Sequence, residues 1–173
     1  STAFLNNKYK YTYGRKLCDP GKPFPQMILI PYFDRATQVV PNCATYPTHQ
    51  TALALIVFYH TWLETFGDEG SVVKDMLQRV MVRWGIEKRA SKLGYSLKGD
   101  RNTSGFILGI VETDSTVWVW QGYDHRIAES ALFHELVHLA LRAIHGSHGD
   151  PDHEGPKYNG WSPAHTRLII ECR

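Results

Sequence analysis

One uninterrupted segment, residues 125–145, constrains the fold of this chain more than any other. It contains no Gly or Pro, Asp124 before it is a good N-cap, and Gly146 follows where a glycine commonly ends a helix. Apolar residues recur along one face, at Phe133, Leu136, Val137, Ala140, Leu141 and Ile144. This periodicity predicts a long helix that is anchored in the core by one face.

Two histidines, His134 and His138, lie four residues apart on this predicted helix. Side chains at that spacing project from one face, with Cβ atoms about 5–6 Å apart. Both imidazoles can therefore bind one zinc ion at about 2.0–2.1 Å. Glu135 is rotated by about 100° from His134, so its carboxylate points beside the ion. A general base is needed there, close enough to take a proton from an attacking water molecule.

A catalytic zinc site needs a third protein ligand and an open fourth position. His145 is too far along the helix axis to share the ion, and the loop that follows offers better candidates. We favour His153, because imidazole is a preferred zinc ligand and a neighbouring carboxylate can orient it. Asp150 is the second choice and Glu171, on the last predicted helix, is the third. One catalytic Zn²⁺ ion is expected.

The remaining segments predict helices and strands within one domain that spans residues 1–173. Helices are expected over residues 49–66, 72–80 and 163–172, and strands over 26–33, 105–112 and 116–121. Residues 81–86 fit a helix or a strand equally well. The last two strands should form a hairpin. The order predicts an α+β fold, with a small mixed or antiparallel sheet against the histidine helix, a backing helix and a C-terminal helix.

The residues H-E-L-V-H at 134–138 resemble the H-E-x-x-H motif of the zincin superfamily of metallopeptidases. The resemblance implies a zincin-like fold in which His134 and His138 bind zinc and Glu135 is the catalytic glutamate. It also implies that the strand before the active-site helix binds extended substrate at a sheet edge. Residues 116–121 occupy that place in the sequence.

The chain departs from the well-known zincin clans. Leu141 and Ile144 stand where metzincins have a glycine and a third histidine, which excludes that clan. The residues HGDPDH resemble the aspzincin pattern only faintly, although they keep Asp150 among the candidate ligands. The cysteine zinc ribbon usual in SprT-like proteases is absent from the sequence. The resemblance therefore implies the superfamily and not a family within it.

Several other residues lie close to these motifs in the sequence. Tyr158 and His165 follow the candidate ligand loop and could each donate a hydrogen bond to an oxyanion; the alternatives are a packed tyrosine and a surface or capping histidine. Trp161 is expected to plug the core beneath the loop. Trp118 and Trp120 fall on one face of their strand and are expected to pack onto the histidine helix.

Composition excludes some classes of function. The net charge is +2 with histidine neutral, so no nucleic-acid partner is indicated. No apolar run approaches the roughly 18 residues that a membrane span needs. Cys18 and Cys43 could form a disulfide, although free thiols fit the sequence equally well. That pairing, and a chain that begins at Ser1 and not Met, favours a secreted or extracytoplasmic location.

Together these observations predict a zinc-dependent peptidase that hydrolyses a peptide or protein substrate, with Glu135 as the general base. Two alternatives stay open. The same site could hydrolyse a non-peptide amide or ester, or zinc could serve a binding or structural module that has no catalytic activity.

Overall fold

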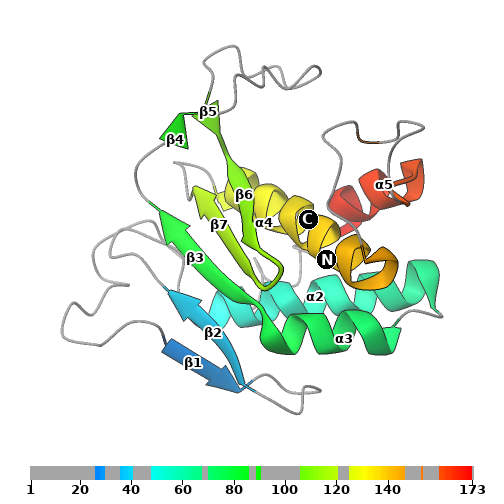
Figure 1. Cartoon of the computed structure of the whole chain (residues 1–173), viewed down its shortest axis with the longest axis horizontal. Coiled ribbons are helices and arrows are strands. Elements are labelled where there is room, and N and C mark those ends of the chain that lie inside the picture. Colours follow the sequence, from blue (N-terminus) through cyan, green and yellow to red (C-terminus); the bar gives the residue numbers. More distant parts are fainter. Residues whose placement is uncertain are drawn as a thin grey trace.

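The computed structural model describes residues 26–29, 36–40, 48–67, 70–85, 89–90, 106–120, 125–146, 153 and 160–172. These residues form an α+β fold, as expected, in which helices pack against a mixed β-sheet (Figure 1). The helices are α2 (Thr48–Phe66), α3 (Gly70–Arg79), α4 (His125–His145) and α5 (Pro163–Cys172). Candidate residues Asp150 and Tyr158, the N-cap candidate Asp124, and Cys18 and Cys43 lie outside the described residues.

The main sheet has five strands in the order β1-β2-β3-β7-β6. The central pairs β2–β3 and β3–β7 are parallel, whereas the outer pairs β1–β2 and β6–β7 are antiparallel. A second, two-stranded antiparallel sheet pairs β4 with β5. The strands are β1 (Gln26–Leu29), β2 (Ala36–Val40), β3 (Met81–Gly85), β4 (Arg89–Ala90), β5 (Phe106–Ile107), β6 (Gly109–Thr113) and β7 (Thr116–Trp120).

The structure confirms the hairpin and decides the one segment that periodicity left open. Asp114 and Ser115 form the turn between β6 and β7, and the Ser115 amide donates to Thr113 Oγ1 at 3.2 Å. Residues 81–85 form β3, a central strand in which buried Val82 and Trp84 alternate with half-buried neighbours. The sequence alone could not decide this segment, because five residues are too few for periodicity to distinguish a helix from a strand until their partners are known.

The core lies between the sheet and the helices. Helix α4 spans the predicted residues 125–145 and ends at Gly146, whose φ of 68° is the left-handed conformation that glycine adopts easily. Its Leu132 and Phe133 are fully buried with Phe58 of α2, and the Phe58 and Phe133 rings stack with centroids 6.5 Å apart. The prediction that residues 49–66 form a core helix is confirmed.

Strand β7 faces the helices with its valines and not with its tryptophans. Val117 and Val119 belong to the core cluster that includes α4, and alternation along the strand directs Trp118 and Trp120 to the opposite face of the sheet. There the Trp118 indole covers Gly85, where a side chain would overlap it. The expectation that Trp118 and Trp120 pack onto α4 is therefore wrong.

Candidate metal centre

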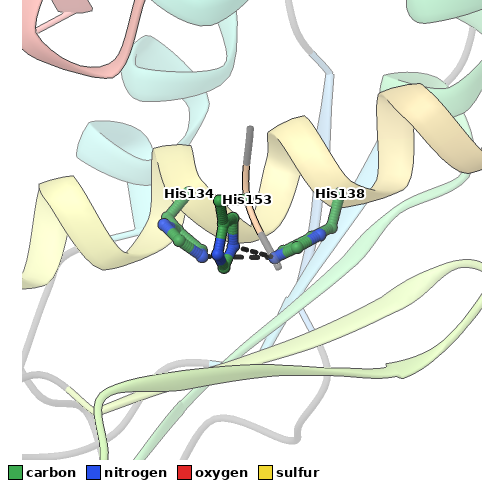
Figure 2. Close-up of side chains that lie close together, drawn as sticks. All are labelled: His134, His138 and His153. Carbon is green, nitrogen blue, oxygen red and sulfur yellow. Dashed lines mark hydrogen bonds between the residues drawn. The ribbon is translucent and has the colours of Figure 1, made fainter. Parts of the chain in front are cut away.

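Three histidine side chains converge beside α4: two from the helix itself and one from residue 153. The Nε2 atom of His138 lies 3.2 Å from Nε2 of His134 and 3.1 Å from Nε2 of His153. Figure 2 shows His153 between His134 and His138, with the three rings turned toward one another. His134 and His138 meet because one helical turn separates them. The favoured candidate, His153, comes to them from the loop after the helix. We call these residues the histidine triad.

The geometry of the triad fits a metal ion. Two nitrogens bound to one tetrahedral zinc at 2.0–2.1 Å are about 3.3 Å apart, close to the spacings of 3.1 and 3.2 Å. All three ligand atoms lie within 4.8 Å of one another. A histidine nitrogen that accepts a bond needs a donor, and an ion at the centre would satisfy three converging lone pairs at once. Among the described residues, no other group of His, Cys, Asp or Glu has this arrangement.

Burial keeps His134 and His138 in the neutral form that can bind a metal. It lowers the pKa of His134 to about 3, with a smaller contribution from His153. Burial also lowers the pKa of His138 to about 2, and the charges of His134, His153 and Arg142 act in the same direction. Both rings are therefore neutral near pH 7, and a neutral imidazole is the form that can bind a metal.

Trp161 provides a common wall for the triad. Its ring centroid is 5.0 Å from that of His134, 4.8 Å from that of His138 and 4.5 Å from that of His153. The indole is buried, and its Nε1–H donates to Thr166 Oγ1 on α5 at 2.9 Å. The expected burial of Trp161 in the core is thus confirmed, and the indole also contacts every ring of the triad. Its place relative to the loop falls outside the described residues.

Glu135 lies against strand β6. Its carboxylate accepts a hydrogen bond from the Val111 amide. Burial raises the pKa of Glu135 to about 8, opposed by Arg142 and by the Val111 amide.

Gly109 leaves room for the Glu135 side chain. A Cβ atom at Gly109 would lie 2.9 Å from Glu135 Cγ, so a glycine is needed at this position. The sequence signal for this was an isolated glycine within an apolar strand, which often marks a close approach.

His165 lies against a different set of residues. Its Nδ1 accepts a hydrogen bond from the Ser162 amide at 2.9 Å, and its ring stacks on Phe66 with centroids 4.3 Å apart. Burial lowers its pKa to about 4, helped by His145 and opposed by a hydrogen bond with the Ser162 backbone. This is a helix cap at the start of α5, in which a histidine three residues after the N-cap bonds back to it. The predicted oxyanion role of His165 is left to its other nitrogen and stays a prediction.

The third-choice ligand, Glu171, is exposed near the end of α5 and is not part of the triad in the described chain. Arg142 was not predicted as a site residue, although it follows His138 by one helical turn on the same side of α4. Its charge acts on both His138 and Glu135. The spacing of four residues from His138 was the sequence signal that could have identified it.

The sheet edge beside the triad is β6 and not β7. Strand β7 pairs with β3 on one side and β6 on the other, so it has no free edge. Strand β6 ends the order of the main sheet, and α4 packs against it (Figure 1). The expectation that residues 116–121 form the edge strand is wrong. It failed because the pairing of β7 with β3 joins residues far apart in sequence, which local patterns do not reveal.

Comparisons with models of protein families, with curated proteins and with solved structures found no match for this chain. Among the described residues, no helix has the length and apolar character required to span a membrane.

Proposed function

We propose that this protein is a zinc-dependent peptidase of the zincin type. The observation that carries the proposal is the histidine triad with Glu135 beside it. Three Nε2 atoms are spaced as ligands of one ion, and a buried carboxylate follows the first ligand directly in the same helix. This is the set of groups that metal-assisted hydrolysis requires, because the water, the base and the ligands must lie together.

The residues of the chain have separate roles in this mechanism. His134, His138 and His153 would hold zinc, which when bound supplies Lewis acidity toward a water molecule and the substrate carbonyl. A positive charge held by the triad favours the ionised form of the Glu135 carboxylate. Glu135 then accepts the proton of the attacking water and passes it to the leaving amine.

Strand β6 supports a peptide as the substrate. Because Trp120 N–H donates to Leu108 O, alternation along the antiparallel pair directs the backbone groups of Gly109 and Val111 away from β7. The Val111 amide bonds to Glu135, but the Gly109 groups and the Val111 carbonyl lie on the side of β6 that has no neighbouring strand in the described main sheet, where another strand can pair. An extended peptide can add to this edge through main-chain hydrogen bonds, which would align it along the side of α4 that carries Glu135.

The test is the substitution Glu135→Gln in zinc-loaded protein. We expect zinc stoichiometry and fold to be kept and peptide hydrolysis to fall by about 10²–10⁴-fold, the usual contribution of a general base. Glu64→Gln is the matched control, since Glu64 is exposed on α2. If Glu135→Gln hydrolyses peptides at the wild-type rate, the catalytic role of Glu135 is wrong. If the wild-type protein binds zinc but hydrolyses nothing, a binding module explains the site better.

A further inference from the structure

We propose that Arg142 is a specificity residue that binds a carboxylate of the substrate, on the N-terminal side of the bond to be cut. The inference rests on the proposed peptidase function and names its substrate class: peptides with an acidic residue close to the scissile bond. It is carried by the position of Arg142 beside the triad and by how few partners its guanidinium has.

Arg142 lies between the triad and the catalytic glutamate around the axis of α4. Taking His134 as zero, His138 is rotated by about 40°, Arg142 by about 80° and Glu135 by about 100°. Arg142 is also about 6 Å beyond His138 along the axis. Side chains of a helix lean toward its N-terminus, so the guanidinium extends back toward His138 and Glu135. Its electrostatic effect on both residues agrees with this placement.

The guanidinium is poorly satisfied by the residues that the structure describes. Its one ion pair in the described chain joins Nη1 to Asp114 Oδ1 at 3.6 Å, and the Asp114 side chain is 83% exposed. The Arg142 Nε is buried and has no hydrogen-bond partner among the described residues. A buried donor without an acceptor is costly. The side chain is 21% exposed, so part of it remains accessible to a ligand.

Arg83 shows what a satisfied arginine looks like in the same molecule. Its Nη1 donates to both carboxylate oxygens of Glu112, at 2.8 and 2.9 Å. Arg142 has no comparable carboxylate, and no ion pair with Glu135 is found in the described residues. A substrate carboxylate would complete Arg142 as Glu112 completes Arg83, since an arginine fork matches a carboxylate.

The direction of β6 decides which side of the substrate meets Arg142. Gly109 and Val111 contact Glu135, and Asp114, just after β6, contacts Arg142. Strand β6 therefore runs along α4 in the direction of the helix. A peptide antiparallel to β6 runs the opposite way, so its N-terminal part passes Arg142. The axial offset between Glu135 and Arg142 is about 10.5 Å, and an extended chain advances about 3.3 Å per residue. The carboxylate should thus lie within about three residues of the cut.

The experiment compares cleavage of a randomised peptide pool, and of matched Asp and Asn peptides, by zinc-loaded wild-type protein, Arg142→Gln and Arg142→Lys. We expect wild type to prefer Asp or Glu on the N-terminal side by about tenfold in kcat/KM, as expected for a charge-assisted hydrogen bond. Arg142→Gln should lose the preference mainly through KM, and Arg142→Lys should keep part of it. Arg79→Gln, an exposed arginine on α3, is the control and should keep all of it.

Two results overturn the inference while leaving the peptidase in place: wild type cleaves Asp and Asn peptides equally, or the preference survives in Arg142→Gln. The first needs no variant, so it holds even if Arg142→Gln does not fold. A third result, no cleavage of any peptide by zinc-loaded wild type, overturns the peptidase and this inference with it.

Discussion

The histidine triad and the single residue His165 all contact Trp161, but their ring nitrogens have different partners. Nδ1 of His165 faces a protein donor, the Ser162 amide, at 2.9 Å. In the triad, Nε2 of His138 faces two other imidazole nitrogens at 3.1 and 3.2 Å. Burial lowers the pKa of His134, His138 and His165 alike, so a lowered pKa does not distinguish a triad histidine from His165.

The comparison teaches that the partner of the nitrogen separates a structural histidine from a candidate ligand. A lone pair that accepts from a backbone amide is already satisfied, and the histidine then stabilises a helix end. Ring nitrogens that converge on one another can hold a cation between them.

Removing the His138 side chain and removing the His165 side chain should have opposite effects on zinc binding. We expect His138→Ala to weaken zinc binding by more than about 100-fold, because even the outer partners of ligands are worth 10–100-fold. His165→Ala should keep one zinc per chain. Metal analysis and competition with a chelator measure both. Equal zinc affinity in the two variants would remove the distinction between the triad and His165.

Gly109→Ala should separate the general base from the metal. The added methyl group meets Glu135 Cγ at 2.9 Å and must displace the carboxylate, and misplacement by about 1 Å can cost about 100-fold in rate. We expect that loss of hydrolysis per bound zinc, with zinc affinity unchanged. Gly85→Ala is the control, since it meets Trp118 on the other face of the sheet. A fully active Gly109→Ala would show that this contact does not position Glu135.

Acid should destabilise the zinc-free protein through the triad. The native pKa of His138, about 2, lies below the ordinary value of about 6.5, so the unfolded chain binds the proton first and stability falls as pH drops below about 6.5. Each such histidine contributes about 1.4 kcal/mol per pH unit. Glu135, with its pKa raised to about 8, acts in the opposite direction, because the native state holds its proton between about pH 4.5 and 8.

The net slope therefore mixes both signs, and a variant isolates one of them. Between pH 6.5 and 4.5, zinc-free His138→Gln should lose about 1.4 kcal/mol per pH unit less stability than wild type. Denaturant unfolding at several pH values measures this difference. Identical slopes would mean that His138 is not held neutral by its surroundings.

Ser162→Ala should have the smallest effect and spare the metal. Ser162 precedes α5, and its carbonyl accepts from the His165 amide at 3.0 Å. Its hydroxyl lies 2.9 Å from His165 Nδ1. Loss of an N-cap side chain costs about 1 kcal/mol, which thermal unfolding would detect, while zinc affinity should not change. A loss of zinc in this variant would show that the cap and the triad are one unit.

Much of α4 and its chemistry could be predicted, because the information is local. Helix limits, the apolar stripe and the placement of His134 beside His138 follow from spacing along one element. Ligand chemistry and loop length favour His153 as the residue that joins His134 and His138, and the geometry agrees with this. Zinc binding itself stays a prediction.

The features that sequence reasoning missed depend on contacts between distant segments. Strand β2 was not predicted as a separate strand, and β7 was taken for an edge because its parallel pairing with β3 is not encoded locally. The cap of His165 was only an alternative reading of that residue. Arg142 went unnoticed, since its significance depends on Asp114 and β6, which reach α4 only in the folded chain.

The wall of the triad has a consequence for the C-terminal helix. Trp161 contacts all three imidazoles, and its indole nitrogen is fixed to Thr166 in the first turn of α5. A change in how closely the three imidazole rings pack against Trp161 should therefore also affect the first turn of α5. The rate of amide hydrogen exchange in α5 should thus report how firmly the triad is held, and this can be measured without a substrate.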